Sequence, residues 1–180
     1  MAKIKGIGIL NVVKLLRERR DHAEPLLDPE MRPYLDQQIL VASWYPEKDF
    51  FRLLRTMALL TPKSGGDPWQ WLGAHCAEVD LIHIYSSMVQ KGNIWGTLER
   101  LPRLWRLYHD SGSADVGMMQ RAQARIILTG FEFAGEDFSR FQAGYLACML
   151  RLAGAQGVSV KPLRRGSATE PAMWLASWRS

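Results

Sequence analysis

The spacing of apolar residues predicts a helix over residues 93–112, around which the rest of the chain is organised. Its apolar side chains recur every three or four residues and therefore share one face: Ile94, Leu98, Leu101, Trp105 and Tyr108. Asn93 can cap the start of this helix, and Gly112 can take the left-handed conformation that ends it. Pro102 removes one hydrogen bond, so we expect a bend there.

The chain before residue 93 is patterned as a series of helices. Apolar residues at helical spacing follow Gly6, Pro29, Pro46 and Pro68. Proline suits the first turn of a helix because the N–H that it lacks has no partner there. The run Thr61–Gly66 contains proline, serine and two glycines, and predicts a loop.

The chain after residue 112 changes to a strand-like pattern. The runs Asp115–Met119 and Arg125–Phe131 predict a hairpin, and Asp137–Ala153 predicts a long helix. Val158–Leu163 and Ala172–Trp178 predict a second strand pair. We therefore expect an α+β fold, in which an N-terminal helical half packs on a small antiparallel β-β-α-β-β sheet crossed by a long helix. Residues 1–180 should form a single domain, with a helical layer over 1–92 and the central helix, sheet and second helix over 93–180.

The composition is typical of a globular protein and does not indicate nucleic-acid binding or a membrane span. The chain has 180 residues, of which 47% are hydrophobic, and a net charge of +5 that is too small to predict nucleic-acid binding. No apolar run is long enough to span a membrane, and Asn11 and Lys14 interrupt the N-terminal apolar stretch, so we expect a cytoplasmic protein. Cys76 and Cys148 lie on apolar helical stripes, which indicates buried free thiols in a reducing compartment.

Candidate catalytic and metal-binding residues are few. His75, Cys76 and His83 lack the paired spacing of a zinc site. Tyr108, His109 and Asp110 are tempting, but adjacent residues on a helix point about 100° apart and cannot form a relay. We therefore expect no cofactor, no metal and no enzymatic activity. The C-terminal hairpin is basic and is either a solvated sheet edge or a site for an anion or partner: Lys161, Arg164, Arg165 and Arg179.

Several segments taken together resemble a known family. They are SWYPEKDFFRLLRTMALL, PWQWLGAHCAEVDLIHIY, LERLPRLWRLYHDSG, ARIILTGF, FQAGYLACMLRLAGAQGVSV and the final SW. This set resembles a paralogous myxobacterial family of unknown function over nearly the whole chain. That family is similar to vinyl-4-reductase-like domains, and more distantly to haem-NO-binding domains and TRAPP subunits. The resemblance implies a helical layer on an antiparallel sheet around an apolar ligand cavity.

The sequence departs from these relatives at two sets of positions. Arg164 and Ala172 stand where vinyl-4-reductase-like domains often carry two cysteines, so a metal or redox role for such a pair has no support. The Tyr-x-Ser-x-Arg motif that holds haem propionates is absent, because Tyr85-Ser86-Ser87 breaks off at Met88. The resemblance therefore implies the fold and a non-catalytic role.

The leading hypothesis is a regulatory domain that senses a small apolar ligand in a cavity between helices and sheet. The aromatic residues expected to line that cavity are Trp44, Tyr45, Trp105, Tyr108 and Tyr145. The alternative is a protein-interaction or dimerisation module without a small-molecule ligand, which binds a second copy or a regulatory protein through an exposed apolar patch.

Overall fold

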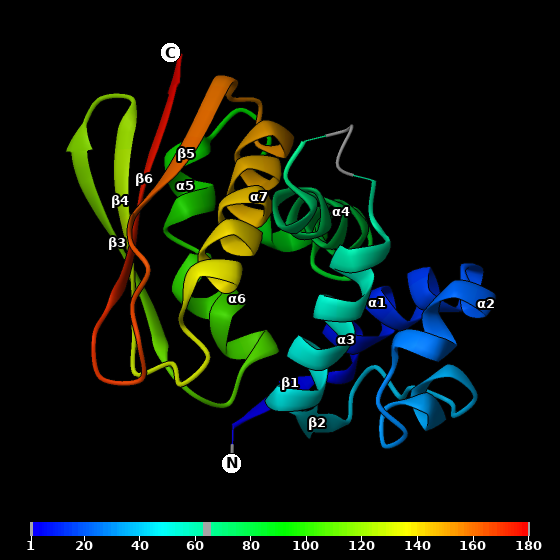
Figure 1. The fold of residues 1–180 in the computed structure, drawn as a ribbon. Coiled ribbons are helices and arrows are strands. Elements are labelled where there is room, and N and C mark those ends of the chain that lie inside the picture. Colours follow the sequence, from blue (N-terminus) through cyan, green and yellow to red (C-terminus); the bar gives the residue numbers. More distant parts are fainter. Residues whose placement is uncertain (1, 63–65, 180) are drawn as a thin grey trace. The chain divides into compact units, whose positions relative to one another are not determined.

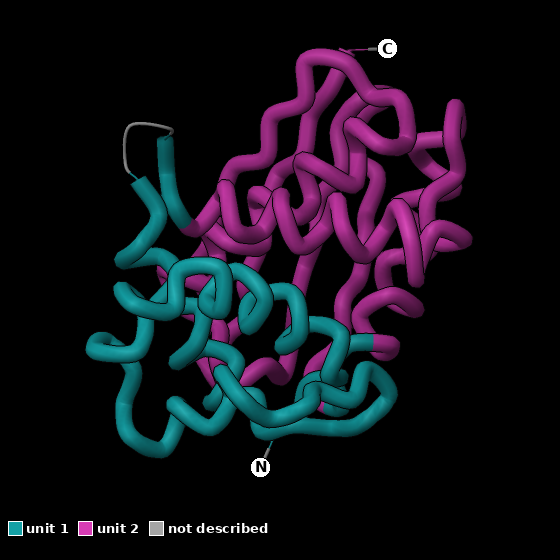
Figure 2. Tube along the Cα trace, turned by 90° about the vertical axis from the view of Figure 1, so that its right-hand side faces the viewer, with its two compact units in different colours: residues 1–68, 108–110 teal, residues 69–107, 111–180 magenta. Residues whose placement is uncertain are grey.

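The computed structural model describes residues 2–62 and 66–179, and it confirms the predicted α+β class. The chain divides into two compact units (Figure 2). The first comprises Met1–Pro68 and Tyr108–Asp110, and the second Trp69–Leu107 and Ser111–Ser180. Along the sequence, the boundary between the two units falls after Pro68, whereas the boundary between the two predicted layers falls after residue 92. That the whole chain is a single domain stays a prediction.

The first unit is built from short strands and the helices that follow them. Strands β1 (Lys3–Lys5) and β2 (Trp44–Pro46) pair antiparallel, and each leads directly into a long helix. The helices and 3-10 turns are α1 (Gly6–Glu18), α2 (Arg20–Ala23), η1 (Glu24–Leu26), η2 (Arg32–Leu35) and α3 (Glu47–Leu60). The helices after Gly6 and Pro46 match the prediction. The helix predicted after Pro29 is only the 3-10 turn η2, and part of the predicted loop, residues 63–65, lies outside the described residues.

The core of this unit lies between α1 and α3, whose apolar faces pack together. The side chains at its centre are fully buried: Val12, Val13, Leu16, Leu53, Leu54 and Met57. Full burial of one such side chain stabilises the fold by about 1.5–3 kcal/mol. Gly6 starts α1 under the loop that precedes β2, and a Cβ there would overlap the Leu40 carbonyl and the Tyr45 ring.

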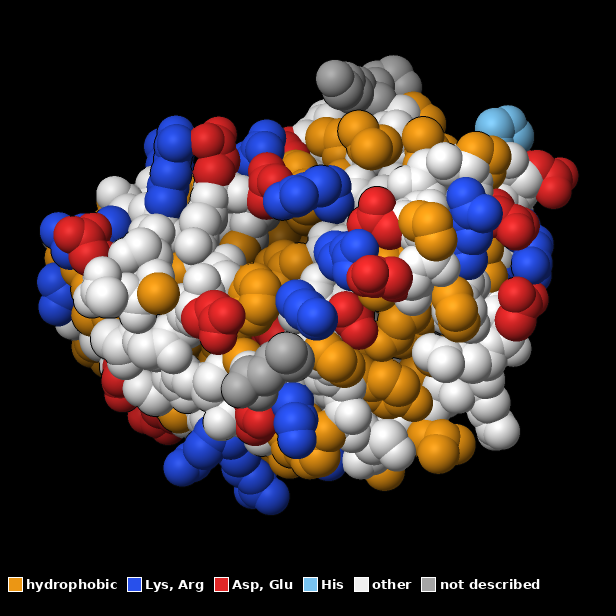
Figure 3. Space-filling model, turned by 60° about the horizontal axis from the view of Figure 1, so that its bottom comes forward, with side chains coloured by type: hydrophobic (Ala, Val, Ile, Leu, Met, Phe, Trp, Pro, Cys, Tyr) orange, Lys and Arg blue, Asp and Glu red, His pale blue; other side chains and the backbone are white. Residues whose placement is uncertain are grey.

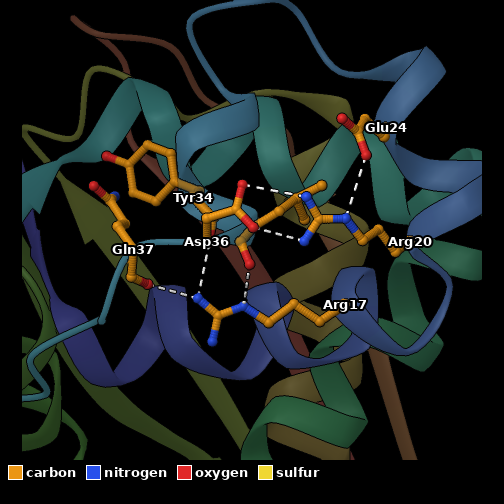
Figure 4. Close-up of polar contacts among 7 residues, drawn as sticks. Arg17, Arg20, Glu24, Tyr34, Asp36 and Gln37 are labelled. Carbon is orange, nitrogen blue, oxygen red and sulfur yellow. Dashed lines mark hydrogen bonds and ion pairs between the residues drawn. The ribbon is translucent and has the colours of Figure 1, made fainter.

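Arginine side chains of α1 and α2 hold the end of η2 and the irregular segment after it in place (Figure 4). The Arg17 guanidinium donates to the carbonyl oxygens of Leu35 at 2.9 Å, Tyr34 at 3.0 Å and Gln37 at 2.6 Å. Arg20 pairs with Asp36 at 2.7 Å. The last carbonyls of a helical turn and those of a loop lack backbone partners, and Arg17 supplies the donors for them here.

The second unit contains an antiparallel sheet with helices on one face (Figure 1). Its strands, in spatial order, are β3 (Ser113–Gln120), β4 (Gln123–Thr129), β6 (Ala172–Arg179) and β5 (Gln156–Arg164). Its helices and 3-10 turn are α4 (Pro68–Ile82), η4 (Ser86–Met88), α5 (Ile94–Leu98), α6 (Leu101–Tyr108) and α7 (Glu136–Leu152). The long helix α7 packs against β5 and β6, and all four strands and α7 confirm the sequence prediction.

Along β4 and β6, buried side chains alternate with more exposed ones, so the two faces of the sheet differ. The side chains toward the helices are buried: Ala124, Ile126, Leu128, Ala172, Trp174, Ala176 and Trp178. Arg125 and Thr129, which alternate with them, are exposed. The Trp174 indole donates to the Ser139 carbonyl of α7 at 2.9 Å, so its polar atom is satisfied inside the core.

The predicted continuous helix over residues 93–112 is wrong, because α5 and α6 are separate helices. Pro102 lies in the first turn of α6, and a proline cannot donate the hydrogen bond that would continue α5 into α6. The predicted start is confirmed, because Asn93 caps α5 by accepting the Gly96 N–H at 2.8 Å. The predicted end is not, because α6 ends at Tyr108, four residues before Gly112, although Gly112 does have a φ of 71°.

Two glycines let α4 and α7 pack closely within the second unit. A Cβ on Gly144 of α7 would overlap the backbone of Gln70, and one on Gly73 of α4 would overlap the backbone of Phe141. The two helices therefore cross with backbone against backbone, as the small residues of the predicted long helix suggest. Among the described residues, no helix is long and apolar enough to cross a membrane.

Candidate functional site

Three of the five predicted ligand-binding residues lie in the first unit. Trp44 on β2 is 41% exposed, and the Lys5 ammonium lies 4.0 Å from the centre of its ring. Tyr45 follows it on the opposite face of the strand, and its hydroxyl accepts the Leu40 N–H at 2.9 Å. Tyr108 is buried, and a Cβ on Gly8 of α1 would be in van der Waals contact with its ring.

The other two predicted residues, Trp105 and Tyr145, lie in the second unit and are buried. Trp105 meets Phe131 edge to face at 5.0 Å between ring centres and Phe138 at 6.3 Å. Its indole N–H donates to the Ser111 carbonyl at 2.9 Å. The structure thus brings Trp44, Tyr45 and Tyr108 into one unit, and Trp105 and Tyr145 into the other.

A buried carboxylate–imidazole pair lies in the first unit and was missed by the sequence analysis. Glu47, in the first turn of α3, is 0% exposed, and its Oε1 lies 2.9 Å from His109 Nδ1. Its Oε2 has no hydrogen-bond partner among the described residues. Glu47 and His109 are 62 positions apart, so no local pattern could join them.

Backbone contacts fix the same segment to β1. His109 forms an isolated bridge with Ile4, and Asp110 accepts the Lys3 N–H at 2.7 Å while its own N–H donates to the Lys3 carbonyl. His109 and Asp110 therefore face different partners, Glu47 and Lys3. The expectation that they do not form a relay assumed that both lie on a helix, whereas α6 ends at Tyr108.

The first turn of α3 carries a second buried carboxylate, Asp49. The Tyr34 hydroxyl donates to Asp49 Oδ2 at 2.9 Å, and both side chains are buried. Burial, followed by the hydrogen bond to Asp49, raises the pKa of Tyr34 well above its usual range. Tyr34 therefore stays protonated and serves as a hydrogen-bond donor.

A surface groove of about 410 Å³ lies between α4 and α7 in the second unit. Its lining residues are Trp71, Ala74, His75, Glu78, Cys148, Arg151 and Leu152. Trp71 is 40% exposed and stacks on His75 with ring centres 5.3 Å apart. Burial raises the pKa of the Cys148 thiol, although Arg151 opposes this effect. The groove therefore presents a protonated thiol, which is a poor nucleophile.

The two cysteines are not part of a cluster of metal-binding side chains in the described part of the chain. Cys76 and Cys148 are free and buried, as predicted, and burial also raises the pKa of Cys76. No group of three or more His, Cys, Asp or Glu residues that could hold a metal ion occurs in residues 2–62 and 66–179. On the face in Figure 3, acidic and basic side chains are interspersed, without an extended area of one sign.

Comparison with known proteins identifies the fold. No protein-family model matches the sequence, and no curated protein matches it. A Cs H-NOX mutant carrying 4-cyano-L-phenylalanine superposes with a TM-score of 0.70 at 12% identity, covering 98% of this chain and 97% of that one. A mutant of the H-NOX protein of T. Tengcongensis has a TM-score of 0.68 at 12% identity, with 98% of each chain covered. An oxygen-binding H-NOX domain related to soluble guanylate cyclases has a TM-score of 0.66 at 11% identity, covering 98% of this chain and 95% of that one.

Other H-NOX structures with this fold concern haem distortion and haem redox potential, so the fit of haem to this chain can be tested on its histidines. His22 and His83 are on the surface, and the His75 ring stacks on Trp71. His109 is oriented by Glu47 as metal-ligating histidines are by their carboxylates. However, the described segment Tyr85–Met88 is a turn and a 3-10 helix whose Ser87 carbonyl accepts from Arg100, and it supplies no set of side chains for propionates. The segment Tyr85–Met88 therefore does not fit the haem propionates, and the chain shares with H-NOX domains their fold.

Proposed function

We propose that this protein is a non-catalytic regulatory domain that senses a small apolar ligand. The observation that carries the proposal is the H-NOX fold, which extends over 98% of the chain and includes an oxygen-binding domain among its members. Fold alone does not define function, so the proposal also rests on the chemistry of the side chains. The five predicted aromatic residues are the ligand contacts that we propose, each within its own unit: Trp44, Tyr45 and Tyr108 in the first, and Trp105 and Tyr145 in the second.

The hydrogen bonding of these aromatic residues supports an apolar ligand. The Tyr45 hydroxyl already accepts a backbone N–H, and the Trp105 indole already donates to a backbone carbonyl. A ring whose polar atom is bound to the backbone offers mainly its carbon surface to a ligand. The preferred ligand is therefore apolar and lacks a charge that would need a buried partner.

The ligand in this proposal is not haem. The segment Tyr85–Met88 does not provide side chains for the haem propionates, and the two thiols are protonated and buried. The sensing role is accordingly one of binding an organic apolar compound, without metal chemistry.

The test is native mass spectrometry of the purified full chain, followed by denaturation and extraction of the bound compound. We expect a mass in excess of 20.5 kDa that is lost on denaturation, and an apolar compound in the extract. Trp44→Ala should lower the bound fraction because it removes an exposed ring without opening the core. Trp71→Ala is the matched control, since Trp44 and Trp71 are 41% and 40% exposed, respectively.

Two results would contradict this proposal. If Trp44→Ala and Trp71→Ala lose the same amount of bound compound, Trp44 does not contact the ligand. A bound tetrapyrrole with a Soret band would show that the ligand is haem.

A second candidate function, a dimerisation module, is favoured by one observation. Met118 and Met119, on β3, are 67% and 52% exposed. Large apolar side chains that stay exposed together at a sheet edge mark a surface for another chain.

A further inference from the structure

The two edges of the four-stranded sheet differ in their protection against pairing with another strand. The β5 edge carries Lys161, Pro162 and Arg164, and its pairing with β6 is irregular at two places. Lysine, proline and bulges are the features by which proteins block an open edge. The β5 edge is therefore unsuited to adding a further strand.

The β3 edge has none of this protection along its first six residues. Ser113–Met118 pairs regularly with β4, and β3 contains neither proline nor a basic residue. Among the described elements, β3 makes extensive contact with β4 alone. With eight residues, β3 is also longer than a typical strand, so it offers a regular row of backbone donors and acceptors.

We propose that β3 pairs antiparallel with β3 of a second copy of this chain, about a two-fold axis at Val116. An isologous interface requires that each contact occur twice with the roles exchanged. In this register Val116 faces its own counterpart, Asp115 faces Gly117 of the second copy, and Met118 faces Ala114. The long, exposed Met118 is thereby covered opposite a short residue.

Charge complementarity supports this occupant and this register. Within one chain, Gly117 lies directly opposite Arg125 of β4, and Asp115 lies opposite Ile127, so all four residues face the same side of the sheet. Gly117 has no side chain, so Asp115 of one copy faces Arg125 of the other across a gap. The gap spans two strand spacings, about 10 Å between Cα atoms. An aspartate and an extended arginine can bridge this distance, and the symmetry provides the pair twice.

The side chains concerned are available for this contact. Asp115 and Arg125 are both exposed, and neither side chain forms an ion pair or hydrogen bond within the described residues. The proposal does not depend on the ligand of the proposed function, because it uses only the edge of the sheet.

The experiment is sedimentation velocity of the full chain over a concentration series, at low salt. We expect a species of twice the 20.5 kDa chain mass that grows with concentration. Asp115→Arg and Arg125→Asp should each raise the dissociation constant of the dimer by about tenfold, since each places like charges together. The double variant restores both pairs and should restore dimerisation. Lys161→Asp on the β5 edge should leave the dimer unchanged.

A second measurement tests the register directly. Val116→Cys should form a disulfide-linked dimer on mild oxidation, because residues at the two-fold axis face each other. Lys161→Cys should not. A monomer at every concentration would overturn the proposal. A dimer that survives both single charge reversals would overturn it as well, since the contact would then lie elsewhere.

Discussion

At the scale of single residues, Tyr34 and Asp49 form a buried pair whose effect on stability depends on pH. Tyr34→Phe leaves the buried Asp49 carboxylate without its donor, so we expect the free energy of unfolding at neutral pH to fall by about 1–3 kcal/mol. The folded protein holds the Tyr34 proton more tightly than the unfolded chain does, because its pKa is raised from an ordinary value of 10.0. The resulting stability is present below pH 10.0 and is lost as the pH rises above it.

Urea unfolding of the wild type and Tyr34→Phe, at neutral pH and above pH 10.0, measures both effects. The decline in stability at alkaline pH should be smaller in the variant. Tyr85, Cys76 and Cys148 also have raised pKa values, but they are present in both proteins and their contributions cancel in the comparison. An equal alkaline decline in the two proteins would contradict this assignment.

The residues of the candidate site show what a sequence can predict about single positions. The stripe containing Trp105 and Tyr108 predicted their burial, because helical spacing is a local property. The Glu47–His109 pair depends on contacts across 62 positions, and Glu47 lies in a helical first turn where an exposed carboxylate is usual. Only the fold reveals that this carboxylate is buried.

At the scale of elements, the α4–α7 crossing depends on Gly144. An added Cβ would overlap the Gln70 backbone, which cannot rotate aside as a flexible side chain could. We therefore expect Gly144→Ala to lower the free energy of unfolding by about 1–3 kcal/mol, even though alanine favours a helix more than glycine does. Thermal unfolding measures the loss. Gly135→Ala is the control, since a Cβ there meets nothing within 4 Å, and equal effects of the two changes would contradict the steric explanation.

The length of an element determines whether its pattern can be recognised in the sequence. α7 and strands β3–β6 follow from periodicity, because each is long enough to repeat its pattern several times. β1 and β2 have three residues each and exist because they pair with each other, so a local reading misses them. The sequence predicts only a bend at Pro102, whereas the chain divides into α5 and α6, which end and begin at Leu98 and Leu101.

At the scale of the whole molecule, the two units are interleaved along the chain. The first unit contains residues 1–68 but takes Tyr108–Asp110 from the middle of the segment that forms the second. Those three residues supply the imidazole that pairs with Glu47 and the carboxylate that accepts from Lys3. The first unit is therefore incomplete as a continuous stretch of chain.

This arrangement predicts that a fragment of residues 1–68 does not fold on its own. Without His109, the Glu47 carboxylate would be buried with neither oxygen bonded, which costs more than leaving it in water. The fragment also loses the two hydrogen bonds between Asp110 and Lys3, one from the Lys3 N–H to the Asp110 carboxylate and one from the Asp110 N–H to the Lys3 carbonyl. Circular dichroism should show little helix in the fragment, and its urea unfolding should lack a cooperative transition.

Glu47→Gln in the same fragment is the diagnostic variant: it removes the uncompensated charge and should recover part of the helix signal. A cooperatively folded wild-type fragment would show that the first unit does not need residues 108–110.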